Sequence, residues 1–332
     1  MLNTFTVDAA AELAVVERGG FIESRHAGSA IVLAPDGTVR ARLGDPDALI
    51  LPRSSLKPLQ AVGMLTAGAA LEGEHLGLAT ASHSGTDAHV RVVREILANA
   101  GLDEGALACP ASAPGDGSTR DEAIRAGAAP VAVRHNCSGK HAAMLLTCTA
   151  NGWSPAGYTD PAHPLQAHLR EVIERLTGEK VRASVIDGCG APVHALTLAG
   201  LARGIQRVGT SSERSPFALH RHAGAVRRAV LAHPWTIAGP GWSDTVLAER
   251  AGVFAKLGAE GVQVAAAPDG TTVALKMLDG SPRAAAIVAV RLLIEAGALD
   301  ASVESAVAPA LHLDVPGGAG IVGAIRPTAT IR

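Results

Sequence analysis

One short segment combines a hydroxyl and an amine at a spacing that suits acyl-transfer chemistry. It reads Ser54-Ser55-Leu56-Lys57-Pro58 and contains a Ser-x-x-Lys tetrad. Pro58 lacks a backbone N–H and clashes with the carbonyl four residues back, so it fits only in the first turn of a helix. We therefore predict Ser54 at a helix N-terminus, with Lys57 one turn later as its base. An N-cap serine followed by a solvated lysine is the alternative interpretation.

A second hydroxyl cluster, Ser82-His83-Ser84, follows a short apolar run and precedes an expected helix. Serines in this position also serve as helix caps and turn residues, so the cluster fits either catalysis or capping. A serine nucleophile needs a neutral base. A lysine can act as one only if burial or neighbouring positive charge lowers its pKa.

A third cluster surrounds Gly139-Lys140. It is not a phosphate-binding loop, because that motif needs Gly at position 134 and Ser or Thr at position 141, where this chain has Arg134 and His141. Cys137 and Lys140 lie one turn apart at an expected helix start, and Cys189 lies in a Gly-rich turn. These three side chains could bind a metal, or the two cysteines could be simply buried thiols, since zinc sites usually show close Cys or His pairs.

The sequence predicts strands mainly toward the two ends of the chain and helices mainly in its middle. Strands are predicted over 13–22, 29–34, 38–43, 76–81, 181–186, 262–267 and 272–278. The turns Pro35-Asp36-Gly37 and Pro268-Asp269-Gly270 predict two hairpins, of 29–34 with 38–43 and of 262–267 with 272–278. Helices are predicted over 142–150, 165–176, 196–203, 217–231, 244–254 and 281–296. Strands at both ends with helices between them indicate an α/β (α+β mixed) fold, with one mixed sheet and a helical subdomain in a single domain over residues 1–332.

Composition excludes several functional classes. The chain is 48% hydrophobic with a net charge of −2, and its aromatic residues are four Phe, three Trp and one Tyr. This composition gives no basic or aromatic surface for nucleic acid. Arg291 and Glu295 interrupt the most apolar stretch, and the first 16 residues lack the pattern of a secretory signal. We expect a cytoplasmic protein that contacts neither nucleic acid nor membrane.

Five motifs, in this order, resemble one family. They are Arg53-Ser54-Ser55-Leu56-Lys57-Pro58, Ala81-Ser82-His83-Ser84, Asn136-Cys137-Ser138-Gly139-Lys140-His141, Asp187-Gly188-Cys189 and Lys256-Leu257-Gly258. The sequence resembles the inducible, Rhizobium-type (class 3) L-asparaginases over nearly its whole length. This resemblance implies a fold similar to serine β-lactamases and penicillin-binding proteins, hydrolysis of L-asparagine to L-aspartate and ammonia, and a homodimer.

The resemblance also implies roles for individual residues. The catalytic pairs would be Ser54 with Lys57 and Ser82 with Lys256, with Ser54 as the nucleophile and the second pair relaying protons. The residues implied to line the substrate site are Arg53, His83, His141 and Asp187. The implied zinc ligands are Cys137, Lys140 and Cys189. The zinc would organise the substrate rather than activate water.

Two other functions remain compatible with the residues. The first is another serine acyl transferase or peptidase resembling a β-lactamase, although no Lys-Thr-Gly triad follows the Ser54 helix. The second is a non-catalytic zinc-binding protein. The sequence does not distinguish asparagine from glutamine as the substrate.

Overall fold

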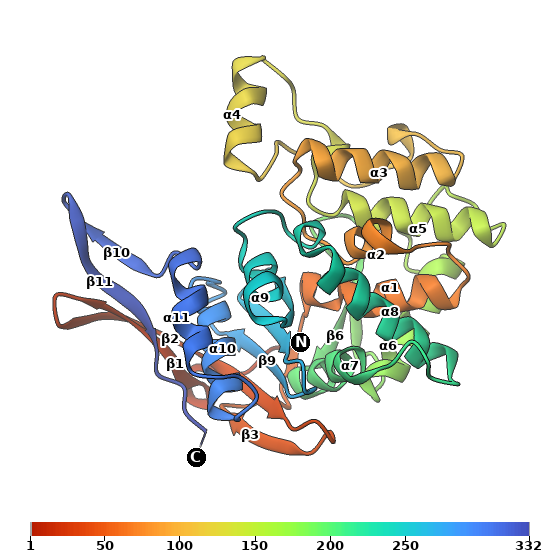
Figure 1. The fold of residues 1–332 in the computed structure, drawn as a ribbon. Helices are drawn as coiled ribbons and strands as arrows, with labels where there is room; N and C mark the ends of the chain where they lie inside the picture. The colour runs from red at the N-terminus through yellow and green to blue at the C-terminus, as the bar shows by residue number, and fades with distance from the viewer. Residues whose placement is uncertain (1, 332) are drawn as a thin grey trace.

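The two ends of the chain build one large sheet (Figure 1). The computed structural model describes residues 2–331. The strand order is β10-β11-β1-β2-β9-β8-β7, with β3 paired to β2. These strands are β1 (Ala11–Arg18), β2 (Phe21–Leu33), β3 (Val39–Leu43), β7 (Phe254–Gly258), β8 (Val262–Ala266), β9 (Thr272–Met277), β10 (Asp314–Gly317) and β11 (Gly320–Pro327).

All pairings in this sheet are antiparallel over residues 2–331. The α+β class expected from the sequence is therefore confirmed, but the mixed sheet is not: it is antiparallel. The two predicted hairpins, around Pro35-Asp36-Gly37 and Pro268-Asp269-Gly270, are confirmed by the β2–β3 and β8–β9 pairings.

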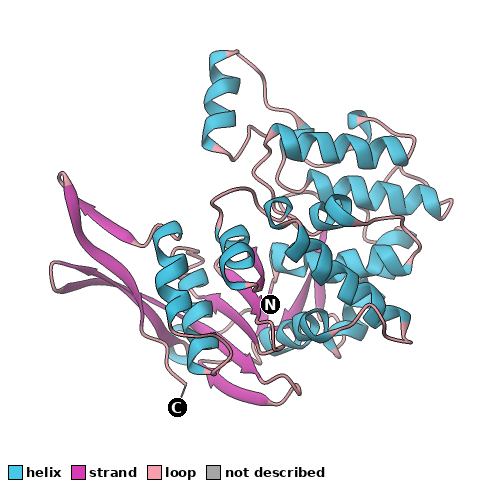
Figure 2. Ribbon diagram, viewed as in Figure 1, coloured by secondary structure: helices cyan, strands magenta, loops and turns pink. Residues whose placement is uncertain are grey.

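The central part of the sheet is buried on both faces, and its side chains alternate between them. In β2, Ile31 and Leu33 pack into the core shared with the helical region. Ala30 and Val32, the residues between, point to the opposite face and pack into a second core. That second face is covered by α10 (Ala285–Glu295), with α11 (Ser302–Val307) beside it (Figure 2).

The middle of the chain forms the helical region. Its helices are α1 (Lys57–Thr66), α2 (Gly73–Ala79), α3 (Asp87–Asn99), α4 (Gly117–Arg125), α5 (Ser138–Ala150), α6 (Pro164–Thr177), α7 (Leu198–Thr210), α8 (Ala218–Ala232) and α9 (Ser243–Ala251). A small antiparallel sheet, in the order β4-β6-β5, consists of β4 (Leu49–Ile50), β5 (Ala183–Ile186) and β6 (Pro192–Thr197).

Several predicted elements differ from those observed. The strand predicted over 76–81 is wrong: helix α2 occupies most of it. A short apolar run without periodicity cannot separate a buried strand from a buried helix. The strand predicted over 13–22 is broken at Gly19 and Gly20, both of which have positive φ and turn the chain into β2.

Helix boundaries near the candidate site also differ. Helix α5 begins at Ser138 instead of residue 142, so Lys140 lies within its first turn. Helix α9 ends at Ala251, and Phe254 already belongs to β7, which places Lys256 on a strand. Within residues 2–331 we find no helix whose length and hydropathy would suit a membrane span.

Candidate active site

Ser54 lies in a 3₁₀ turn that leads directly into α1. The turn, η2, spans Arg53–Leu56, and Pro58 lies in the first turn of the α-helix that follows. The sequence-based position of Pro58 is thus confirmed. The Ser54 side chain is partly exposed and lines a cavity of about 370 Å³.

Lys57 is directed toward the second serine. Its side chain is 1% exposed, and its Nζ donates to Ser82 Oγ at 3.0 Å and to Cys137 Sγ at 3.1 Å. It also donates to the carbonyl of Ala81. The expected hydrogen bond between Lys57 and Ser54 is not present among the described residues. The amine instead bonds to the loop that carries Ser82. The spacing of Ser54 and Lys57 along one helix could not predict this contact, because it comes from another part of the chain.

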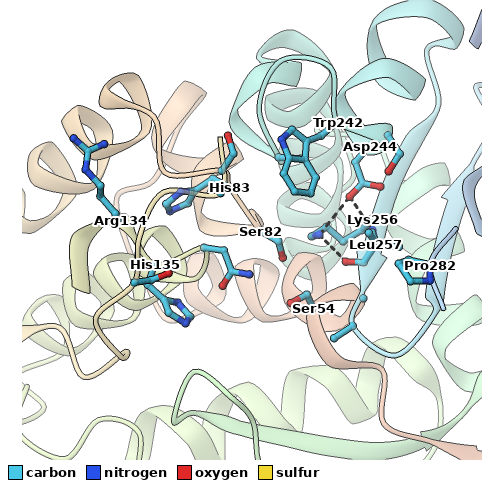
Figure 3. A pocket seen from close by; sticks show the side chains of 18 of the residues that line it. Ser54, Ser82, His83, Arg134, His135, Trp242, Asp244, Lys256, Leu257 and Pro282 are labelled. Atoms are coloured by element: carbon cyan, nitrogen blue, oxygen red, sulfur yellow. Dashed lines mark hydrogen bonds and ion pairs between the residues drawn. The ribbon is translucent and has the colours of Figure 1, made fainter. Parts of the chain in front are cut away.

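The second lysine reaches the same cavity from the sheet. Lys256 is on β7, fully buried, and lines the cavity together with Ser54 and Ser82 (Figure 3). Its Nζ donates to the carbonyl of Leu257 at 2.7 Å and lies 3.4 Å from Asp244 Oδ2. Burial lowers the pKa of Lys256 to about 8, and the positive charge of Lys57 acts in the same direction, while Asp244 opposes it.

A close backbone contact fixes the sheet against the Ser54 turn. A Cβ at Gly258 would lie 2.5 Å from the carbonyl oxygen of Pro52 and 3.3 Å from the amide of Ser55. Only a residue without a side chain allows β7 to approach η2 this closely. Gly258 therefore brings Lys256 and Ser54 to the two sides of one cavity.

His83 lines the cavity but has both ring nitrogens engaged. Nδ1 accepts from the Gly85 amide at 3.2 Å, and Nε2 lies 3.0 Å from Ser138 Oγ. Burial lowers the pKa of His83 well below its ordinary value, helped by His89 and Lys57. The residue is a neutral, fixed part of the wall.

Arg53 and Asp187 form an ion pair at the edge of the site. Arg53 Nε donates to Asp187 Oδ1 at 2.7 Å, and both side chains are partly exposed. Burial raises the pKa of Asp187, but the hydrogen bond and charge of Arg53 outweigh it, so the pKa is lowered overall. Arg53 itself has φ of 53°, a strained backbone conformation for a residue with a side chain.

The three predicted metal ligands are brought together behind Lys57. Lys140 Nζ lies 3.2 Å from Cys189 Sγ, and Cys137 and Cys189 pack in one buried cluster. The neighbouring Cys189 thiol lowers the pKa of Cys137 well below its ordinary value, and the charges of Lys57 and Lys140 add to this. Burial opposes the charge of Lys140, but the two thiols outweigh burial and raise its pKa.

Next to this cluster is a buried nitrogen without a partner. His141 Nδ1 lies 2.6 Å from the hydroxyl of Tyr158, and that hydroxyl oxygen also accepts from the Ala108 amide at 3.0 Å. His141 Nε2 has no hydrogen-bond partner among residues 2–331, and Cys189 lies beside the ring. Burial lowers the pKa of His141 to about 4.

These donors fit a zinc site in their chemistry. Two thiols and an amine are soft and borderline ligands of the kind that zinc accepts. No group of three or more His, Cys, Asp or Glu side chains in the described part of the chain could hold a metal, so any site here depends on Lys140.

The sequence analysis did not identify four residues that the structure places at the site. Trp242, Asp244 and Glu260 line the cavity, and Tyr158 holds His141. Asp244 was the one that the sequence could have indicated, because it is an acidic residue at the start of a predicted helix, shortly after the turn Gly239-Pro240-Gly241.

Comparison with known proteins identifies the family. The sequence family described as L-asparaginase II matches residues 14–327, and the chain belongs to it. No curated protein matches.

Solved structures give more distant similarities. The structure of Mglu in its native form is 12% identical, with a TM-score of 0.45, covering 80% of this chain and 63% of that one. Mglu in its glutamate form is 12% identical, with a TM-score of 0.46, covering 82% of this chain and 61% of that one. The chain thus spans less than two thirds of the Mglu length.

Proposed function

We propose that this chain is an amidohydrolase that converts L-asparagine to L-aspartate and ammonia. The observation that carries the proposal is membership of the L-asparaginase II family over residues 14–327. The site supports it, because Ser54, Ser82 and the buried Lys256 line one cavity, and Lys57 contacts Ser82. An amide hydrolase needs a nucleophile, a proton acceptor and a proton donor within reach of one carbonyl group.

In this mechanism Ser54 Oγ attacks the side-chain amide carbon. Its hydroxyl has no hydrogen-bond partner among the described residues, so it is free to approach a substrate. Lys57, one turn further along, accepts the serine proton after its amine turns from Ser82 toward Ser54. Hydrogen bonds of this kind often tighten only when substrate is bound.

The leaving nitrogen needs a proton as the C–N bond breaks. Lys256 supplies it, directly or through the Ser82 hydroxyl, and ammonia departs from the acyl-enzyme. A water molecule then attacks the Ser54 ester and gives one proton to the now neutral Lys256. The C–O bond to Ser54 breaks, Ser54 Oγ takes back the proton that Lys57 holds, and aspartate is released. The amides at the N-terminal turn of α1 stabilise the oxyanion in both steps.

Arg53 and Asp187 are the proposed anchors for the charged end of the substrate. The Arg53 guanidinium would bind the α-carboxylate and the Asp187 carboxylate the α-ammonium group. Each keeps free hydrogen-bonding capacity while the two are paired, since a guanidinium has five donors and a carboxylate several acceptor positions.

Cys137, Lys140 and Cys189 would hold a zinc ion. When bound, the ion supplies a fixed positive charge beside the site. The chain's own residues carry every proton-transfer step in this mechanism.

The test is ammonia release from asparagine, measured beside glutamine and beside turnover of the β-lactam nitrocefin. Release of ammonia from asparagine at a higher kcat/KM than from glutamine is the expected result. Preference for glutamine would replace the substrate but keep the reaction. Nitrocefin turnover without ammonia release would indicate a β-lactamase-like acyl transferase. No turnover of any of the three, with zinc bound, would indicate a non-catalytic zinc protein.

A further inference from the structure

Asp244 is buried next to the catalytic cavity, yet it belongs to none of the five sequence motifs. Its side chain is 2% exposed and lies in the first turn of α9, where the helix dipole favours a negative charge. In Figure 3 its carboxylate and the Lys256 amine face one another on the wall that also carries Trp242. A buried carboxylate is costly unless it is paired and hydrogen-bonded, so its partners need to be accounted for.

Two donors other than Lys256 hold this carboxylate in place. The backbone amide of Leu257 donates to Oδ2 at 2.8 Å, and Gln263 Nε2 donates to Oδ1 at 3.2 Å. The carboxylate is therefore fixed to two neighbouring strands, β7 and β8. Its position does not depend on the lysine.

In the described part of the chain, Asp244 is the one charged partner of the Lys256 amine. The only protein partners of this amine among residues 2–331 are the Leu257 carbonyl at 2.7 Å and Asp244 Oδ2 at 3.4 Å. Lys57 has no carboxylate partner there, since its amine contacts a carbonyl, the Ser82 hydroxyl and the Cys137 thiol. The two lysines of the site thus differ in that one is paired with a negative charge.

We propose that Asp244 is a positioning residue that keeps the Lys256 side chain in the cavity as a charged ammonium group. The inference rests on the proposed amide hydrolysis for its catalytic meaning. It assigns different roles to the two lysines: Lys256 donates the proton to the departing nitrogen, and Lys57 accepts the proton from the serine.

Some of the surroundings of Lys256 favour its charged ammonium form and others disfavour it. Burial disfavours its ammonium form, and Asp244 favours it. The other titratable or charged groups that face it or share its cavity are Lys57, Cys137, His83, Arg134, His135 and Glu260. Unlike these groups, Asp244 bonds the Lys256 amine directly.

The substitution Asp244→Asn removes the charge with little change in shape. Gln263 Oε1 is buried without a partner, so a flipped Gln263 amide could accept from the new asparagine while the Leu257 amide keeps its acceptor. The flip would give up the bond that Gln263 Nε2 donates to the Val264 carbonyl at 3.1 Å. Gln263→Met is the matched control, because it removes one hydrogen bond to Asp244 and leaves the charge in place.

The measurement is a pH titration by NMR of protein carrying ¹³C at the lysine ε-carbon, with Lys256 identified by the signal lost in Lys256→Met. We expect the Lys256 midpoint to fall by about 1 to 3 pH units in Asp244→Asn and to stay in place in Gln263→Met. An unchanged midpoint in Asp244→Asn overturns the proposal. The titration needs no turnover, so it is independent of whether asparagine is the substrate.

A second variant covers failure of Asp244→Asn to fold. Loss of the carboxylate would leave a buried ammonium unpaired, and the double variant Asp244→Asn/Lys256→Met removes both charges. Recovery of the folded state in the double variant supports the pairing. If the double variant also fails to fold, Asp244 serves the packing of α9 on the sheet, and the proposal is wrong.

Discussion

Ser54 and Ser82 present two different hydroxyls to the cavity. Ser82 is already hydrogen-bonded to Lys57 at 3.0 Å, whereas the Ser54 hydroxyl has no partner in the described part of the chain. The bond of Ser82 to Lys57 favours a role for Ser82 in passing protons on. The unbonded hydroxyl of Ser54 favours a role for Ser54 as the group that bonds to the substrate carbon.

We expect Ser54→Ala to abolish acyl-enzyme formation and Ser82→Ala to slow turnover while leaving some acyl-enzyme. Neither should unfold the protein. The Ser54 hydroxyl has no hydrogen-bond partner among the described residues, and loss of the Ser82 bond to Lys57 costs about 1–3 kcal/mol. The measurement is steady-state ammonia release together with mass spectrometry of acid-quenched enzyme. An acyl adduct that survives in Ser54→Ala would reassign the nucleophile to Ser82.

The pH dependence follows from Lys256, whose pKa is lowered to about 8 mainly by burial. Raising the pH through 8 removes its proton, so a lysine that must donate a proton loses activity there. We therefore expect kcat/KM to fall above about pH 8 in the wild type and this limb to be absent in Lys256→Met. A limb that persists unchanged in Lys256→Met would belong to another group.

At the scale of elements, the contact between η2 and β7 holds the two halves of the site together. We expect Gly258→Ala to destabilise the fold by about 1–3 kcal/mol through overpacking and to lower kcat/KM, because the Ser54 turn must move away from Lys256. Gly320→Ala is the control: a Cβ there meets nothing within 4 Å. Urea unfolding and turnover measure both effects, and equal behaviour of the two variants would contradict this role for the contact.

The sequence predicted the elements that carry the site better than the contacts between them. Pro58 identified the start of α1, and the two Pro-Asp-Gly turns identified both hairpins. The partner of Lys57 was missed, because it comes from a loop that only the tertiary fold brings near. Lys256 would have been interpreted as a surface lysine without the family resemblance, and its burial follows from pairings that spacing does not encode.

The same reason explains the error over residues 76–81. Leu76 and Leu78 are buried, as predicted, but in a helix. The residue types predicted the burial of this segment. Its helical conformation is set by packing against α5 and α8, which the sequence of the segment alone does not show. Asp244 was overlooked because a carboxylate at a helix start has an ordinary explanation that needs no catalytic site.

At the scale of the whole molecule, a zinc ion would tie the start of α5 to the turn after β5. Such a tie stabilises the folded chain, because the ligands come together only in the native state. We expect about one zinc per chain by elemental analysis, a lower Tm after chelation, and little zinc in Cys189→Ser.

Cys148→Ser is the matched control for zinc content, since Cys148 is also buried and lies outside the cluster. Equal zinc in both cysteine variants, or none in the wild type after zinc is supplied, would remove the metal site. The single domain and the homodimer stay predictions, and light scattering of the purified protein measures the second.

The cavity lies where the helical region meets the large sheet: Ser54 and Ser82 come from the first, Lys256 and Gly258 from the second. In the proposed mechanism, neither part alone contains a complete set of reacting groups. Activity therefore depends on the contact between the helical region and the sheet. A small separation of the two would abolish turnover while nearly all of the secondary structure stayed intact. Turnover is thus a more sensitive measure of complete folding than helix content.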